Sequence, residues 1–461
     1  WFRHPIKQIH ALKKKSMIID ENKKAGSGLY FTVQLKFVVA FIGACFWAGF
    51  SIWIAQDWID DLSNYIGQFA AIFFVYGIAI IPGFMNSFAA FSLLMDRRPK
   101  REPLPVYPGI TMLVAAYNEA ASIKDTLVSI ALQKYPGPLQ VIVINDGSQD
   151  NTADIVRQAE AKYPWLALLD LKKNAGKANA LNQGLKIAEH DLIITVDADS
   201  YLHKVALINI VERYKLDPPN TRAVAGKILV RNSRENMLTK VQEWDYFLGI
   251  AATKRLQSLY QGTLVAQGAF SIYDRDALIE VGGWPECVGE DIVLTWALLK
   301  AGYRVGHCED ACLFTNAPMT LKVFVKQRQR WARGMIEAFI KHPAILIKPR
   351  LSTFFIHWNL FFPWLDIAFT FGFIPGLILA CFGHYWIVGI MTLALLPLAF
   401  LLGLLNYKIE RSMFKHLDLK VRKNFVGFLL YVLTYSFLLQ PASILGYLDE
   451  VFRTRKTWGT K

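Results

Sequence analysis

Charged residues are scarce in this sequence, and acidic residues are scarcer than basic ones. Charged residues make up 19% of the 461 residues against 53% hydrophobic residues, and the formal net charge is +14. Such a low charged fraction excludes an ordinary cytosolic protein of this length. A basic surplus by itself fits nucleic acid, anionic lipid or an anionic substrate, so the distribution of the residues has to decide between them.

Cysteine is also scarce, with five residues scattered along the chain. Cys45 and Cys381 lie in apolar runs, where a thiol packs as a small hydrophobic group. The pair Cys308 and Cys312 lacks a second ligand pair at zinc spacing, which argues against a zinc site. The cytosolic placement inferred below also argues against structural disulfides.

Long uncharged runs dominate both ends of the chain. About 20 apolar residues are enough to cross a hydrocarbon core roughly 30 Å thick. One run, Ile367–Tyr407, is long enough for two crossings, with a turn near Gly383 and His384. The sequence therefore predicts an integral membrane protein with two spans in 31–95 and about three in 351–448, where an interfacial helix at Phe354–Trp364 is an alternative. The runs are Phe37–Ala55, Ile66–Met95, Ile367–Tyr407 and Phe425–Leu448.

Basic residues flank the first two predicted spans, in the basic segment 1–30 and again at Arg97–Arg101, while the loop between the spans carries three aspartates. By the positive-inside rule the N-terminal segment and the central domain face the cytoplasm of a multi-pass inner-membrane protein. The first run begins too late and is too long for a cleavable signal peptide. Five crossings would leave the basic tail 449–461 outside, against the rule, so the side of the C-terminus stays open.

The pattern changes between the spans, in a segment assigned to 100–318. Short apolar runs alternate there with amphipathic helical stretches, which predicts βαβ units and a mostly parallel sheet. Ligands bind outside the carboxyl ends of such strands. The predicted fold class is therefore an α/β domain inserted between transmembrane helices. Polar residues at the predicted strand ends are Asn118, Glu119, Asp146, Asp197 and Asp199.

Asp197 and Asp199 follow a hydrophobic strand as Asp-Ala-Asp. The two carboxylates can converge where the strand ends and the chain turns. Converging carboxylates repel unless a hard divalent cation lies between them, and Mg²⁺ or Mn²⁺ could then bridge to a diphosphate. The alternative is a solvated turn. The preceding strand favours the metal site.

Two helix starts carry further candidates. Gly176 and Lys177 open a predicted helix, where free N–H groups and a lysine suit an anionic ligand. Glu290 and Asp291 open a later helix after a glycine-rich loop. An acidic pair at this position either stabilises the helix by its interaction with the helix dipole or supplies a general base that takes a proton from a hydroxyl.

A stretch in the segment 319–350, KQRQRWARG at 326–334, combines four basic residues with a tryptophan. Gln327, Arg330 and Trp331 share one face of the predicted helix Thr320–Lys341. Arginine matches phosphate with a bidentate fork, and tryptophan offers a flat apolar plate for a sugar ring. The residues expected instead to be juxtamembrane charges meeting anionic lipid are Lys326, Arg328 and Arg333.

Taken in order, these motifs resemble the inverting family-two glycosyltransferases, specifically the processive membrane-embedded polysaccharide synthases. The family pattern is Y-N-E, D-G, K-A-x-x-L-N-x-G, D-x-D, [TG]-E-D and Q-x-x-R-W. The resemblance covers about residues 108–345, and segments such as AFSIYDRDAL look most like the poly-β-1,6-N-acetylglucosamine synthase branch. The six motifs begin here at Tyr117, Asp146, Lys177, Asp197, Gly289 and Gln327.

The resemblance implies a GT-A fold, a UDP-sugar donor, a growing polysaccharide acceptor and Mg²⁺ or Mn²⁺ as cofactor. It implies that Asp291, beside Glu290, is the catalytic base and that Trp331 forms the floor of the acceptor site. The implied metal-site residues are Asp197 and Asp199. The implied donor-binding residues are Tyr117, Glu119 and Asp146 at the uridine end, and Lys177, Asp197, Gln327 and Arg330 at the nucleotide and diphosphate.

The function implied is processive, inverting synthesis of a β-linked polysaccharide, with UDP-N-acetylglucosamine as the favoured donor and secretion through the protein's own channel. Alternatives are a hyaluronan or chitin-type synthase, a non-processive lipid-carrier transferase, and a transporter or scaffold with a degenerate transferase domain. The Q-x-x-R-W motif argues against the non-processive enzyme, and the intact carboxylates argue against the degenerate domain. Expected partners are membrane lipid and, as in related bacterial synthases, a small membrane accessory subunit; nucleic acid is not expected.

Overall fold

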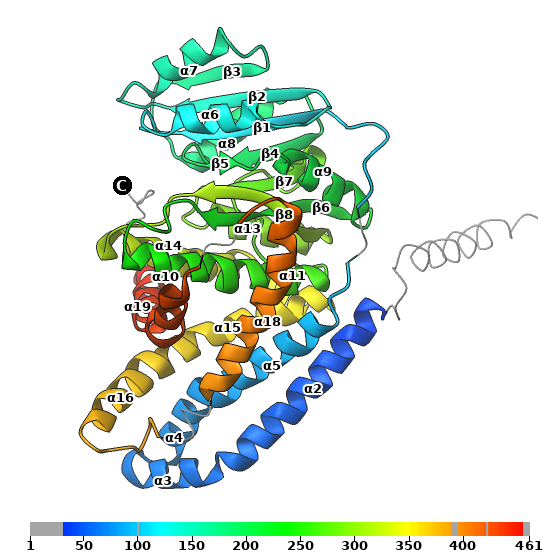
Figure 1. Cartoon of the computed structure of the whole chain (residues 1–461). Coiled ribbons are helices and arrows are strands. Elements are labelled where there is room, and N and C mark those ends of the chain that lie inside the picture. The colour runs from blue at the N-terminus through cyan, green and yellow to red at the C-terminus, as the bar shows by residue number, and fades with distance from the viewer. Residues whose placement is uncertain (1–30, 99–100, 390–394, 421–422, 455–461) are drawn as a thin grey trace, which may run out of the picture.

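The computed structural model describes residues 31–98, 101–389, 395–420 and 423–454. An α/β domain lies at one end of a group of long helices (Figure 1). Its eight strands form one sheet in the order β3-β2-β1-β4-β7-β6-β8-β5. The strands are β1 Ile110–Ala116, β2 Leu139–Asp146, β3 Leu166–Leu171, β4 Leu192–Val196, β5 Tyr201–Leu202, β6 Thr221–Val230, β7 Phe270–Asp274 and β8 Arg304–Thr315.

The first half of the sheet is parallel, because a helix connects each strand to the next one in β1 to β4. β7 runs antiparallel to both β4 and β6, while β6 and β8 are again parallel. The predicted mostly parallel α/β fold is therefore confirmed. The domain helices are α6 Ile123–Ala131, α7 Thr152–Glu160, α8 Lys177–Lys186, α9 Ala206–Leu216, α10 Met237–Trp244, η2 Asp245–Ile250, α11 Ala251–Leu259, α12 Arg275–Glu280, α13 Glu290–Ala301 and α14 Leu321–Lys341.

Both faces of the sheet are covered, which explains why the strands read as continuous apolar runs. Met112 and Val114 of β1 belong to a core that includes residues of α6 and α9, whereas Leu113 between them belongs to the opposite core with α8. All three side chains are fully buried. This packing holds the strand ends, and the polar loops that follow them, in fixed relative positions.

Four of the described helical segments are long and apolar enough to cross a membrane: Val33–Ile54, Gln68–Leu94, Leu351–Cys381 and Phe425–Val451. The chain turns at Gly383 (φ 85°), as predicted, and α18 follows. Phe354–Trp364 is part of the third segment and not a separate interfacial helix. The elements here are α2 Val33–Ile54, α3 Gln56–Ile66, α4 Gln68–Val75, η1 Tyr76–Ile80, α5 Ile81–Leu94, η3 Pro343–Ile347, α15 Leu351–Ala368, η4 Phe369–Phe373, α16 Ile374–Cys381, α18 Leu395–His416 and α19 Phe425–Val451.

The last apolar helix, α19, packs along α14 and α10 of the α/β domain. The hydroxyl of Tyr447 donates a 2.7 Å hydrogen bond to Asp366, which joins α19 to α15. The side chain of Asp366 is buried at this helix contact.

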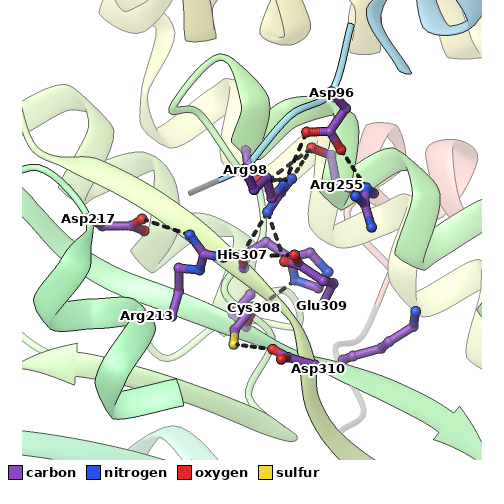
Figure 2. Close-up of polar contacts among 12 residues, drawn as sticks. Asp96, Arg98, Arg213, Asp217, Arg255, His307, Cys308, Glu309 and Asp310 are labelled. Carbon is purple, nitrogen blue, oxygen red and sulfur yellow. Dashed lines mark hydrogen bonds and ion pairs between the residues drawn. The ribbon is translucent and has the colours of Figure 1, made fainter. Parts of the chain in front are cut away.

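A buried group of ion pairs fastens the chain leaving α5 to the α/β domain (Figure 2). Asp96 accepts hydrogen bonds from Nε of Arg98 at 3.3 Å and from Nε of Arg255 at 2.5 Å. Arg98 donates to Glu309 of β8 at 2.9 Å, and Arg213 of α9 lies 3.7 Å from the other oxygen of Glu309. We call Asp96, Arg98, Arg213, Arg255 and Glu309 the linker cluster.

Each charge in the linker cluster has an opposite charge beside it. Burial alone would raise the pKa of Glu309, but Arg98 and Arg213 outweigh burial and hold that pKa well below its usual range. At the edge of the cluster, burial raises the pKa of Asp217 to about 6 against the opposing effect of Arg213. The cluster thus holds the linker after α5 against β8 and α11 of the domain.

Candidate active site at the carboxyl ends of the strands

The loop after β1 is fixed to the loop after β2 by hydrogen bonds donated from each loop to the other. Asn118 adopts a positive φ of 54°, which asparagine tolerates better than most residues. Its N–H donates to the hydroxyl of Ser148 at 3.0 Å, and its side-chain oxygen accepts from the N–H of Gln149 at 2.9 Å. This arrangement leaves the preceding Tyr117 40% exposed at the rim of the sheet.

Two of the carboxylates predicted to bind uridine are engaged by the protein itself. Glu119 accepts a 2.6 Å hydrogen bond from the hydroxyl of Ser122 at the start of α6. Asp146 is buried and accepts from the N–H groups of Ala175 and Gly176, at 2.9 and 2.8 Å. Asp146 thereby fixes the loop that immediately precedes Lys177. The contact of Glu119 and Asp146 with uridine stays a prediction.

Lys177 lies at the centre of the carboxylates. Its ammonium nitrogen is 2.5 Å from Asp197 and 3.9 Å from Glu290. Gly268 faces the same nitrogen, and a Cβ at that position would come within 2.9 Å of it. Burial would lower the pKa of Lys177, but Asp197 and Glu290 raise it above its usual value, so the lysine stays charged. The structure thus brings together residues from three distant motifs.

The two acidic residues that open α13 differ in their surroundings. Glu290 is buried, and burial together with Asp291 raises its pKa to about 7, opposed by Lys177 and Arg330. Asp291 is half-buried and accepts from the backbone N–H groups of Gly268 at 3.4 Å and Ile292 at 2.8 Å. Asp291 is therefore the more accessible of the two carboxylates.

Asp197 and Asp199 are both partly exposed in the turn after β4. Carboxylate oxygens are the hard ligands that Mg²⁺ and Mn²⁺ prefer. Within residues 31–98, 101–389, 395–420 and 423–454, no group of three or more His, Cys, Asp or Glu side chains is placed to hold a metal ion. The pair therefore fits a cation whose remaining ligands come from a substrate's phosphate oxygens and water, and does not fit a closed protein site.

The α14 helix packs directly against the loop that carries the acidic pair. Gly334 and Gly289 touch through their backbones, because a Cβ on Gly334 would come within 2.7 Å of the Cα of Gly289. Glu337, one turn further along α14, accepts a 2.9 Å hydrogen bond from the N–H of Gly289. Two glycines facing each other thus bring the helix close to Glu290 and Asp291.

This geometry agrees with the comparisons. Residues 108–334 match the family model described as "Glycosyltransferase like family 2". The chain carries a family-two glycosyltransferase domain. The expected family resemblance and the GT-A fold are confirmed.

Curated relatives of the glycosyltransferase domain include the poly-beta-1,6-N-acetyl-D-glucosamine synthases of two staphylococci. The Staphylococcus aureus (strain COL) protein is 37% identical over 234 residues, which are 50% of this chain and 56% of that protein. The Staphylococcus epidermidis protein is 34% identical over 249 residues, or 54% of this chain and 60% of that protein. The chain therefore spans little more than half the length of these relatives.

Among solved structures, a mannosyltransferase from Pyrobaculum calidifontis, in complex with GDP-Man and Mn²⁺, superposes with a TM-score of 0.58. It is 23% identical, and the alignment covers 84% of this chain and 99% of that chain. At this identity the likeness supports the fold of the glycosyltransferase domain alone.

The Q-x-x-R-W residues of the glycosyltransferase domain lie in two settings. Gln327 has a buried side-chain oxygen without a hydrogen-bond partner in the described part of the chain. The positive charge of Arg330 opposes the rise in the pKa of Glu290. Trp331 is 39% exposed and lies near Tyr246, with 6.3 Å between ring centroids.

The prediction that three basic residues of α14 face lipid is wrong for two of them. Arg328 is only 3% exposed and pairs with Asp245 at 3.0 Å. Arg333 is also buried and pairs with Glu450 at 2.9 Å, which ties α14 to the end of α19. Lys326 is exposed, as expected. The prediction failed because both partners are distant in sequence, so the basic stretch alone gave no sign of them.

Lys254 of α11 was not singled out from the sequence. It is buried, and burial lowers its pKa to about 7 against the opposing effect of Asp291. Lys254 also acts on His307 of β8. Burial and the charge of Lys254 both lower the pKa of His307. A lone lysine in an amphipathic stretch carries no signal of its own, and only the fold shows that the charge of Asp291 acts on it.

Proposed function

We propose that this chain is a processive, inverting glycosyltransferase that builds a β-linked polysaccharide from a UDP-sugar, with UDP-N-acetylglucosamine as donor. One observation carries the proposal: Lys177, Asp197 and the Glu290–Asp291 pair meet at the carboxyl ends of the strands, beside Arg330. The names of the staphylococcal relatives support the choice of sugar.

In the proposed reaction, Asp291 accepts the proton of the acceptor hydroxyl as that oxygen attacks the anomeric carbon of the donor. The bond from the anomeric carbon to UDP breaks, and UDP leaves with the bonding pair. A sugar hydroxyl is a weak nucleophile, so a positioned carboxylate base is needed. A single displacement inverts the α-linked donor into a β-linked product.

The leaving diphosphate develops negative charge, which cationic groups stabilise. Lys177 and Arg330 would supply side-chain charge, and Gln327 would donate to the diphosphate through its amide. A divalent cation held by Asp197 and Asp199 would supply further charge neutralisation at the diphosphate. Tyr117, Glu119 and Asp146 would border the uridine, and Trp331 would support the acceptor sugar.

A cavity of about 310 Å³ supports the proposed exit path. It lies between α5, α11, α15 and α18 and mixes amide side chains with aromatic rings. A sugar polymer suits such a lining, because hydroxyl groups pair with amides while the faces of the sugar rings stack on aromatic groups. Among its lining residues are Asn86, Gln257, Trp358, Asn359, Phe362 and Asn406.

The proposal includes a cytoplasmic active site. α11 borders this cavity and also carries Lys254, on whose pKa the charge of Asp291 acts. The growing chain would thus pass from the site into the membrane segments without leaving the protein. A small membrane subunit and surrounding lipid complete the proposed partners.

The test uses membranes that contain the protein, a panel of radiolabelled UDP-sugars and Mn²⁺ or Mg²⁺, followed by sizing of the product. We expect long labelled polymer from UDP-N-acetylglucosamine. Polymer only from a mixture with UDP-glucuronic acid would identify a hyaluronan-type synthase, and β-1,4-linked product a chitin-type one. Label confined to a singly glycosylated lipid would overturn processive synthesis.

A further inference from the structure

The guanidinium of Arg328 lies over the ring of Trp331, one helical turn further along α14. Its central carbon is 4.1 Å from the centre of the indole ring. Arg328 is 3% exposed, whereas Trp331 is 39% exposed. The arginine therefore covers part of the tryptophan from the protein side, and the rest of the indole remains accessible.

Arg328 is held in turn by groups from three elements. Asp245 of η2 lies 3.0 Å from its guanidinium. The rings of Phe324, Tyr246 and Tyr435 surround it at 5.1, 5.8 and 6.0 Å. We call Asp245 and these three rings the arginine box; it joins α14 to η2 and to α19.

A buried guanidinium needs a partner charge, and Asp245 provides it. This ion pair ties α14 to η2. Stacking on Trp331 does something further: a planar guanidinium pairs favourably with an aromatic face. A partly exposed tryptophan can otherwise occupy several rotamers, and the stacked arginine selects one of them.

We propose that Arg328 is a positioning residue for the acceptor: held by the arginine box, it fixes Trp331 so that the end of the growing polysaccharide is retained between additions. The inference rests on the proposed function, because it assumes that Trp331 meets the acceptor sugar. Arg328 acts through Trp331 and does not touch the donor.

The test compares Arg328→Met, Arg328→Lys and Asp245→Asn with the wild-type protein purified in lipid nanodiscs. Rates are measured against UDP-N-acetylglucosamine and against added N-acetylglucosamine oligosaccharides, and products are sized. The matched control is Arg333→Met, which removes another buried, ion-paired arginine of the same helix without touching Trp331.

We expect Arg328→Met to raise the KM for the oligosaccharide about tenfold and to shorten the product, while the KM for the donor stays within about twofold. Arg328→Lys and Asp245→Asn should give smaller changes in the same direction. Arg333→Met should leave the ratio of the two KM values unchanged.

Equal effects of Arg328→Met and Arg333→Met, or a parallel rise in both KM values, would show a merely structural arginine and overturn the inference. If Arg328→Met no longer binds UDP because it misfolds, Arg328→Lys and Asp245→Asn decide in the same way. A wild-type protein that makes no polymer would refute the proposed function itself, whereas normal polymer from Arg328→Met refutes only this inference.

Discussion

Two groups of charged residues, the linker cluster and the active site, differ in how their charges are paired. In the linker cluster, Asp96 and Glu309 each lie between two arginines. In the active site, one lysine contacts both Asp197 and Glu290, and Asp291 accepts from backbone N–H groups. In the linker cluster each of these carboxylates thus has two arginines beside it. In the active site one lysine is shared by two carboxylates.

The pKa shifts express the same difference. Arginines hold the pKa of Glu309 well below its usual range, so that this carboxylate stays charged despite burial. In the active site, burial and Asp291 raise the pKa of Glu290 to about 7, and burial lowers that of Lys254 to about 7. Groups that titrate near neutral pH are typical of sites that bind or transfer protons. We therefore interpret the linker cluster as structural and the groups around Glu290 as the place where chemistry occurs.

The largest expected effect is on the active-site side. Asp291→Asn removes the proposed base while keeping its shape, so we expect transfer to fall by about 10²–10⁴-fold. Binding of UDP, measured by calorimetry, should change little. The exposed Glu286 in the same loop offers a control, since Glu286→Gln should keep its activity. Normal turnover by Asp291→Asn would refute the base assignment.

The linker cluster should respond in stability. Glu309→Gln leaves Arg98 and Arg213 without their shared carboxylate, and breaking a buried pair costs about 3–5 kcal/mol of unfolding free energy. Thermal unfolding in detergent measures the loss. Asp154→Asn, which removes the exposed pair with Arg157, should stay within about 0.5 kcal/mol. Equal stability of the two variants would contradict a structural role for the cluster.

A third change tests how closely α14 must approach the acidic loop. Gly334→Ala would place a Cβ 2.7 Å from the Cα of Gly289, so the backbone has to shift. We expect kcat to fall about tenfold, equivalent to about 1.4 kcal/mol, with UDP affinity retained. Gly49→Ala, where nothing lies within 4 Å, is the control. An unchanged kcat would show that this contact is irrelevant to the base.

The smallest expected effect is a pH dependence at the edge of the linker cluster. Because the pKa of Asp217 is raised to about 6 in the folded protein, its contribution to stability is full below its unfolded pKa near 4 and is lost as the pH rises through about 6. Asp217→Asn removes this loss. The stability of the variant relative to wild type should therefore increase by about 1 kcal/mol between about pH 5 and pH 7.5. A constant difference in thermal unfolding would contradict the shifted pKa.

The comparison also shows what sequence patterns can predict. The alternation predicted for 100–318 is visible at β2, Leu139–Asp146, because a buried parallel strand is a continuous apolar run that ends in polar residues. The helix predicted at Thr320–Lys341 is α14. Motifs placed at these ends could be read locally, since each depends on residues close together in the chain.

Features that depend on distant partners were missed. β8 was not predicted, although its Glu309 pairs with Arg213 of α9 and with Arg98 of the linker. The burial of Arg328 depends on Asp245, 83 positions earlier. No pattern within one segment encodes such pairs, and Asp245 itself lies at the start of a π turn, Asp245–Ile250, that a helical pattern does not reveal.

The central claim is that the strand-end carboxylates support transfer of a sugar from UDP. The most direct measurement incubates the purified protein in lipid nanodiscs with radiolabelled UDP-N-acetylglucosamine, before and after EDTA and with Mn²⁺ restored, and follows label in high-mass polymer. We predict polymer with the cation, none with EDTA, and recovery when Mn²⁺ returns. Intact UDP-N-acetylglucosamine under all conditions, or full polymer synthesis in EDTA, would contradict the account.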